Sequence, residues 1–136
     1  MINPVTWFFS PPPPPVSPWR AWVWWELRRI PFNIIIGVYG IVCLIIFYAS
    51  ILSTGYLEPG EDPVEPVVLL FAPFIINALY SLGWFAELPL RVFIRKDLDA
   101  GPLLLKMGLG LGLALITIPA ALWGAIRIMQ LMGVRQ

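Results

Sequence analysis

Long apolar stretches separated by short polar ones dominate this 136-residue chain. No charged residue occurs between Arg29 and Glu58, and two further charge-free stretches cover residues 66–86 and 107–126. A helix of about 20 apolar residues crosses a hydrocarbon core about 30 Å thick, whereas an isolated strand could not satisfy its backbone in lipid. The pattern therefore predicts three transmembrane helices, over residues 33–54, 66–88 and 103–127.

The segment before the first span combines a proline run with a helical pattern. Pro11 to Pro15 favour polyproline II and form a stiff spacer, or a ligand for an aromatic-lined groove of a partner. Ser17 is a suitable N-cap, Pro18 fits the first helical position, and Pro31 ends or kinks a helix. Between them an apolar stripe recurs at helical spacing: Trp19, Trp22, Val23, Leu27 and Ile30.

These features predict an all-α membrane protein in which a proline-rich N-terminal tail and a short interfacial amphipathic helix precede three transmembrane helices. The expected boundaries are 1–16 for a cytoplasmic tail, 17–30 for the interfacial helix and 31–136 for the three-helix domain. The composition agrees, since 59% of the residues are hydrophobic and the mean hydropathy is +0.81. No basic region precedes Trp7, so we expect no cleavable signal peptide.

Several classes of function are disfavoured by composition. A net charge of +1 provides no basic stripe for nucleic acid. The chain has no histidine and a single cysteine, Cys43, so the usual ligands of zinc, haem and iron–sulfur clusters are missing. The "GLGLGL" run at 108–113 follows no strand and lacks the spacing of a nucleotide-binding motif. We therefore expect no cofactor, no metal and no nucleic-acid partner.

Charge placement predicts the orientation. Basic residues precede the first span and lie between the second and third: Arg20, Arg28, Arg29, Arg91, Arg95, Lys96 and Lys106. The loop between the first two spans is acidic, with Glu58, Glu61, Asp62 and Glu65. The positive-inside rule then places the N-terminus in the cytoplasm and the C-terminus outside. Arg127 and Arg135 violate this rule mildly.

Charged and polar residues also form a belt at the expected cytoplasmic edge of the first two spans. Its members are Glu26, Arg28, Arg29, Asn33, Glu87 and Arg91. Tryptophan and arginine favour the headgroup region and its phosphates. Glu26 has a local partner in Arg29, three residues later. Antiparallel spans would instead let Glu87 meet Arg28 or Arg29, and let Glu26 meet Arg91. We expect this belt to hold helices together rather than to perform chemistry.

Polar and small residues inside the spans suggest contacts between helices. Asn77 and Tyr80 occupy the second span, where an amide needs a partner. Tyr39, Tyr48 and Thr117 are the expected partners, and a substrate or ion contact is the alternative. Small residues spaced four apart let helix backbones approach closely. We expect packing at Gly108, Gly112, Ala121 and Gly124, within one chain or between copies.

Two segments, "WWELRRIPFNIIIGVYG" and "NALYSLGWFAELPLR", resemble a group of small uncharacterised bacterial integral membrane proteins. In that group a W-E-x-R-R-x-x-aromatic-N segment opens the first span. The similarity falls on Trp25, Glu26, Arg28, Arg29, Phe32 and Asn33, and then on Asn77, Tyr80, Leu82, Gly83 and Glu87. Phe32 stands where the group often carries tyrosine, which weakens any catalytic role for that position. The resemblance implies a bacterial cytoplasmic membrane and no known activity.

Three functions are compatible with the sequence. The first is an accessory, assembly or regulatory subunit that acts through contacts with lipid and other membrane subunits, or as a homo-oligomer. The second is an interfacial enzyme or lipid-handling protein, in which arginines bind a lipid phosphate and a glutamate acts as base. The third is an oligomeric transporter or channel with Asn77 and Tyr80 along its pathway. We favour the first, which is not an enzyme, because the chain lacks a familiar catalytic constellation.

Overall fold

Three long helices make up most of the computed structural model, which describes residues 3–14, 17–94 and 100–133. They are α2 (Pro18–Thr54), α3 (Pro66–Pro89) and α4 (Ala100–Leu131), and each is long and apolar enough to cross a membrane. A short helix, α1 (Pro4–Phe8), precedes them, and a π-helical turn, η1 (Leu90–Ile94), follows α3. The prediction of an all-helical fold with three such helices is confirmed for the described residues.

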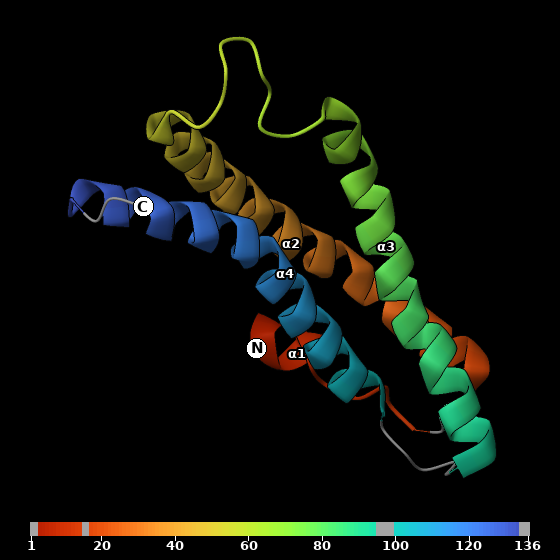
Figure 1. Cartoon of the computed structure of the whole chain (residues 1–136). Helices are drawn as coiled ribbons and strands as arrows, with labels where there is room; N and C mark the ends of the chain where they lie inside the picture. The colour runs from red at the N-terminus through yellow and green to blue at the C-terminus, as the bar shows by residue number, and fades with distance from the viewer. Residues whose placement is uncertain (1–2, 15–16, 95–99, 134–136) are drawn as a thin grey trace.

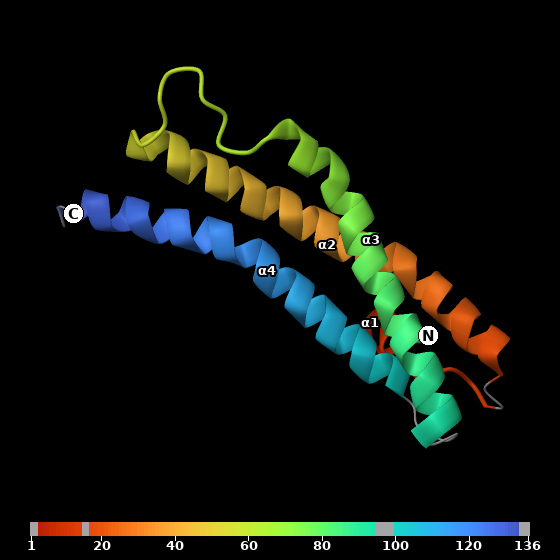
Figure 2. The same ribbon diagram turned by 45° about the vertical axis from the view of Figure 1, so that its right-hand side comes forward.

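The three long helices run up, down and up (Figures 1 and 2). α2 and α4 are parallel and make the most extensive contact, while α3 crosses them in the opposite direction. The starts of α2 and α4, the end of α3 and the short α1 lie at one end of the bundle. The loop over 55–65 and the end of α4 lie at the other. Arg95, Lys96 and Arg135, which the orientation prediction used, lie outside the described residues.

The start of α2 follows the sequence signals. Ser17 is the N-cap and its hydroxyl accepts a hydrogen bond from the Arg20 amide at 3.3 Å. The same signal begins α1, which was not predicted: the Asn3 side chain accepts from the Val5 amide, and Pro4 takes the first helical position. Only the described part of the expected 1–16 tail can be compared, and there Pro11 to Pro14 lie outside any helix.

The expected boundary at Pro31 requires correction, because α2 continues through this proline. Residues 18–30, which follow the N-cap Ser17, therefore form the first turns of α2 rather than a separate helix. Buried side chains continue at helical spacing on both sides of Pro31, with Trp25 and Arg28 before it and Phe32 and Ile36 after it. Packing along this face stabilises a continuous helix.

Two apolar clusters join α2 to its neighbours. The first, near α1, contains Phe8, Trp24, Trp25, Phe32, Ile36, Tyr80 and Leu105. The second, towards the 55–65 loop, contains Cys43, Phe47, Ile51 and Ala120. The stripe predicted for an interfacial helix points away from these clusters, since Trp19, Leu27 and Ile30 are exposed. An outward apolar stripe is the arrangement expected of a helix in contact with lipid.

Of the small residues predicted to pack, some lie at the α2–α4 interface and others lie on the outer surface of α4. A Cβ atom at Gly112 would lie 3.1 Å from the Ile36 side chain, and one at Gly124 would lie 3.9 Å from the Ser50 hydroxyl. Gly108 faces open space, and Ala121 is exposed. Helical spacing alone therefore did not identify which small residues meet α2 within one chain.

Candidate functional site: the polar belt where α2 crosses α3

Glu87 is the most deeply buried acidic residue of the belt, with 2% of its surface exposed. It lies on α3 and faces Trp25 of α2, whose indole Nε1 donates a hydrogen bond to Glu87 Oε2 at 2.5 Å. Arg91, one turn later, donates from Nε to Glu87 Oε1 at 2.7 Å. The carboxylate thus has one partner on another helix and one cationic partner nearby. A buried ion pair needs such additional hydrogen bonds to offset its desolvation.

Two glycines provide the space for Trp25 and Glu87. A Cβ atom at Gly83 of α3 would lie only 2.7 Å from Cη2 of Trp25, which is too close for any real contact. At Gly101 of α4, a Cβ atom would meet both Glu87 carboxylate oxygens, at 3.1 and 3.2 Å, and the Trp24 ring at 3.2 Å. Sequence reasoning did not identify Gly101, and Gly83 entered only through the family resemblance. Their role depends on which side chains other helices bring to them.

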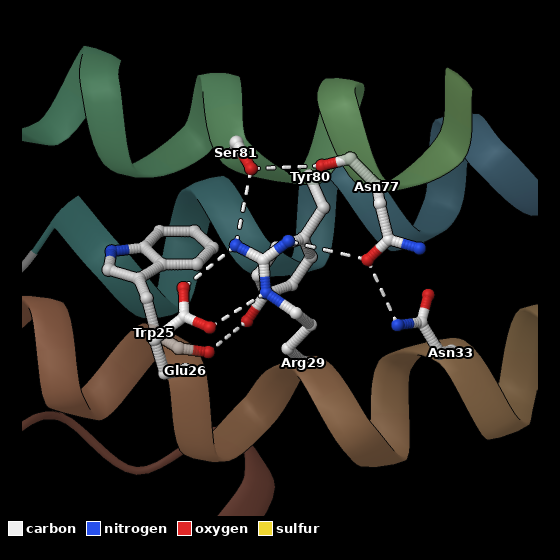
Figure 3. Close-up of polar contacts among 7 residues, drawn as sticks. All are labelled: Trp25, Glu26, Arg29, Asn33, Asn77, Tyr80 and Ser81. Carbon is white, nitrogen blue, oxygen red and sulfur yellow. Dashed lines mark hydrogen bonds and ion pairs between the residues drawn. The ribbon is translucent and has the colours of Figure 1, made fainter. Parts of the chain in front are cut away.

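Glu26 and Arg29 form a second, more open ion pair on α2 (Figure 3). The guanidinium donates from Nε and from Nη2 to the two Glu26 oxygens, at 2.9 and 2.7 Å. It also reaches α3, where it donates to Asn77 Oδ1 at 3.3 Å and to the Ser81 hydroxyl at 3.2 Å. The side chains of Arg29 and Glu26 remain 28% and 35% exposed. This pair is therefore the accessible part of the belt.

Asn77 of α3 forms hydrogen bonds with two members of the belt, Arg29 and Asn33 of α2. Its side-chain oxygen accepts from Asn33 Nδ2 at 3.0 Å, besides Arg29, and its amide donates to the Pro73 carbonyl. The predicted partners of Asn77, which were Tyr39, Tyr48 and Thr117, were wrong, since none of them is bonded to it. Tyr39 and Thr117 bond to each other between α2 and α4. Asn77 lies on α3, and its amide is satisfied at the crossing with α2.

Tyr80 fixes the packing beneath the belt. Its hydroxyl donates to the Trp25 carbonyl at 2.5 Å, and its ring packs against Trp25 and Phe32. The Arg29 guanidinium lies over the same ring, 5.0 Å from its centre. Tyr80 is buried, so its contacts are structural. The ring belongs to the apolar cluster that contains Trp25 and Phe32, so it brings Arg29 into contact with this cluster.

Arg28 does not contact either glutamate. It is 3% exposed and lies beneath the chain before α2. Its Nε donates to the Phe8 carbonyl at 2.9 Å, and Nη2 donates to the Trp7 carbonyl at 2.7 Å. The guanidinium lies over two tryptophan rings, with its carbon 4.7 Å from the centre of Trp7 and 4.1 Å from that of Trp24. It thus caps the end of α1, where carbonyl groups favour a cation.

The ion pairs predicted across the helices are therefore wrong. Glu87 does not meet Arg28 or Arg29, and Glu26 does not meet Arg91; each glutamate pairs with an arginine three or four residues later on its own chain segment. Partners at this spacing always face each other on a helix, whereas a pair between helices also needs the correct rotation of both. The helices are instead joined by Trp25–Glu87, Arg29–Asn77 and Asn33–Asn77.

The chemistry available at the belt is limited by these contacts. Within residues 3–14, 17–94 and 100–133, no group of histidine, cysteine and acidic side chains could hold a metal ion. Glu87 is enclosed by its partners, and Glu26 is engaged at both oxygens by Arg29. Comparisons of the chain with protein-family models, with curated proteins and with solved structures gave no match.

Proposed function

We propose that this chain is a small integral protein of a bacterial cytoplasmic membrane that acts through contacts, as an accessory, assembly or regulatory subunit of a membrane complex. One observation carries the proposal: the polar side chains at the α2–α3 crossing are used to join helices to one another. A catalytic group must be able to reach a substrate. Side chains committed to internal contacts stabilise a scaffold.

The outward faces of the helices support the same proposal. On α3 only Tyr80 and Glu87 are buried, while large apolar side chains such as Leu70 and Phe74 are exposed. Lipid satisfies an apolar face as well as a partner helix does, so exposure alone does not identify a partner. A span that uses so little of its surface within its own chain nevertheless leaves most of it available for contacts between subunits.

Purification from native membranes tests this function. A tagged chain is extracted in mild detergent, its complexes are sized, and their components are identified by mass spectrometry. We expect a stoichiometric larger membrane protein to copurify. Leu70→Ala with Phe74→Ala should reduce its yield without changing the stability of the chain itself. The matched control is Ile45→Ala with Leu52→Ala, an equally apolar and exposed pair on α2. A solitary monomer that keeps full cellular activity in both double variants would refute the proposal.

A second candidate, lipid handling at the membrane interface, is favoured by the partial exposure of Glu26 and Arg29. An arginine that is accessible at the edge of a span can contact a lipid phosphate. If the chain handles lipid, Glu26→Gln should abolish the lipid-handling activity while the set of copurifying proteins stays the same. In the subunit function, the same substitution should leave both assembly and cellular activity close to those of the unmodified chain.

A further inference from the structure

The chain before α2 forms a strap over the cationic end of the bundle. We use this name for residues 3–10, which include α1 and are followed by the proline run. Two cations contact successive residues of the strap: Arg28 of α2 bonds to the Phe8 carbonyl, and the Lys106 amino group of α4 lies 5.4 Å from the centre of the Phe9 ring. The strap therefore covers the buried Arg28 of α2 and contacts the exposed Lys106 of α4.

Arg28 is satisfied only by neutral oxygens. Its hydrogen-bond acceptors are the carbonyls of Trp7, Phe8, Ser10 and Trp24 and the Ser10 hydroxyl. Among the described residues no carboxylate pairs with Arg28 or with Lys106. The strap itself has no acidic residue. A buried guanidinium without an anionic partner keeps an uncompensated charge, which is unfavourable in a medium of low dielectric constant.

The strap depends on few attachments. Within the described chain, all hydrogen bonds between strap and helices come from Arg28 and from the Trp24 indole, which donates to the Ser10 carbonyl at 2.8 Å. Phe8 adds an apolar contact. Pro11 to Pro14 connect the strap to α2 and have no amide hydrogens to donate. An anion that binds Arg28 in place of the strap carbonyls would therefore remove most of the hydrogen bonds that hold the strap to the helices.

We propose that Arg28 and Lys106 form a binding site for a phosphate oxyanion and that the strap occupies this site until such an anion displaces it. Phosphate accepts two parallel hydrogen bonds from a guanidinium, and these charge-assisted bonds are stronger than those of neutral carbonyls. Arg28 lies just before the long apolar stretch of α2, and Lys106 just before that of α4. This is the depth at which phospholipid headgroups present their phosphates. The proposal is independent of whether the chain has a partner subunit.

The test follows the mobility of the strap in the full-length chain. A nitroxide label is attached at Thr6→Cys, an exposed strap position, in a Cys43→Ser background. The protein is placed in nanodiscs of phosphatidylcholine alone or mixed with phosphatidylglycerol. Both lipids carry a phosphate, but the choline cation neutralises it in the first. We expect a several-fold larger mobile fraction in the electron paramagnetic resonance spectrum with phosphatidylglycerol.

A separate arm distinguishes the source of the anion. If glycerol 3-phosphate added to phosphatidylcholine nanodiscs also mobilises the label, the site takes soluble phosphates. If only phosphatidylglycerol does so, the ligand is a lipid headgroup. Both results support the site. A label that is equally immobile under all three conditions overturns it.

Variants separate this site from general attraction between basic protein and acidic lipid. Lys106 is exposed, so Lys106→Gln should fold normally and should lower the response to the anion several-fold. Arg127→Gln, which removes the same charge near the far end of α4, is the matched control and should keep the full response. Equal responses in these two variants would overturn the proposal. Arg28→Gln should release the strap in every lipid, with no further response.

Discussion

The indole of Trp25 and the carboxylate of Glu87, 62 positions apart in sequence, are joined by a hydrogen bond that links α2 to α3. Arg91 completes the charge balance of Glu87 from the same segment, and Gly83 and Gly101 leave room for both side chains. This small set of residues determines how closely the first two long helices approach. Its disruption should therefore affect stability more than any other change in the belt.

Glu87→Ala should be strongly destabilising. It removes the acceptor of the buried Trp25 indole and the carboxylate that pairs with Arg91, and removal of one partner of a buried pair costs about 3 kcal/mol or more. Glu87→Gln should cost less, because an amide oxygen can still accept from the indole. The free energy of unfolding is measured by titration with a denaturing detergent in mixed micelles. Glu58→Gln in the exposed 55–65 loop is the control and should change little.

Gly83→Ala should lower the free energy of unfolding by about 1–3 kcal/mol, the usual cost of overpacking. The new methyl group would clash with Trp25, which is fully buried and cannot move aside. Gly108→Ala is the matched control, since a methyl group there meets nothing and alanine favours a helix. The same detergent titration compares the two. Equal stability of both variants would show that α3 does not approach Trp25 this closely.

The number of long helices was predictable because charge-free length is a property of consecutive residues. The start of the first one was not, since α2 begins at Pro18 and continues through Pro31. The contacts of the belt were not. Glu26 and Arg91 have opposite charges and similar depth, but whether they meet depends on the rotation of α2 and α3 about their axes, which burial of Trp25 and Tyr80 decides. A local pair such as Glu26–Arg29 needs only helical spacing. Of the two partners considered for Glu26, Arg29 was therefore the correct one.

The contact of Arg28 with the strap could not be predicted from the sequence for a different reason. Residues 3–10 show no hydrophobic period, so nothing in their pattern indicates where they lie. The one local signal in this segment is Asn3 followed by Pro4, which is a typical start of a helix. It predicts α1 but not its position over Arg28, since the intervening prolines can direct the chain in many ways. Long-range contacts made through backbone carbonyls leave no residue type in the sequence to identify them.

Asn33 and Asn77 should show energetic coupling. Their side chains share a hydrogen bond between α2 and α3, and such bonds within membranes contribute about 0.6 kcal/mol on average. A double-mutant cycle of Asn33→Ala and Asn77→Ala should therefore give a coupling free energy of about that size. Asn77→Ala and Thr117→Ala, which share no contact, should be additive within about 0.5 kcal/mol. Coupling between the second pair instead would favour the partners expected from sequence alone.

Glu26→Gln should be mild compared with Glu87→Gln. The Glu26–Arg29 pair is partly exposed, and exposed pairs contribute about 0–1 kcal/mol. Arg29 also keeps its contacts with Asn77 and Ser81 after the substitution. The two variants are compared by thermal unfolding in the same detergent. A loss of stability in Glu26→Gln as large as that in Glu87→Gln would mean that the open pair, rather than the buried one, joins α2 to α3.

The proposed orientation places the strap in the cytoplasm and the 55–65 loop outside. Single cysteines at Pro14→Cys and Pro59→Cys in a Cys43→Ser background test this arrangement, because both prolines are exposed and neither substitution changes the charge. A membrane-impermeant maleimide added to intact cells should label Pro59→Cys and not Pro14→Cys. Permeabilised cells should show labelling at both. The starts of α2 and α4 lie at one end of the bundle (Figure 1). These two helices carry Arg28, Arg29 and Lys106, so the positive-inside rule predicts this result. The reverse pattern in intact cells would place the strap outside and would contradict the orientation that the positive-inside rule predicts.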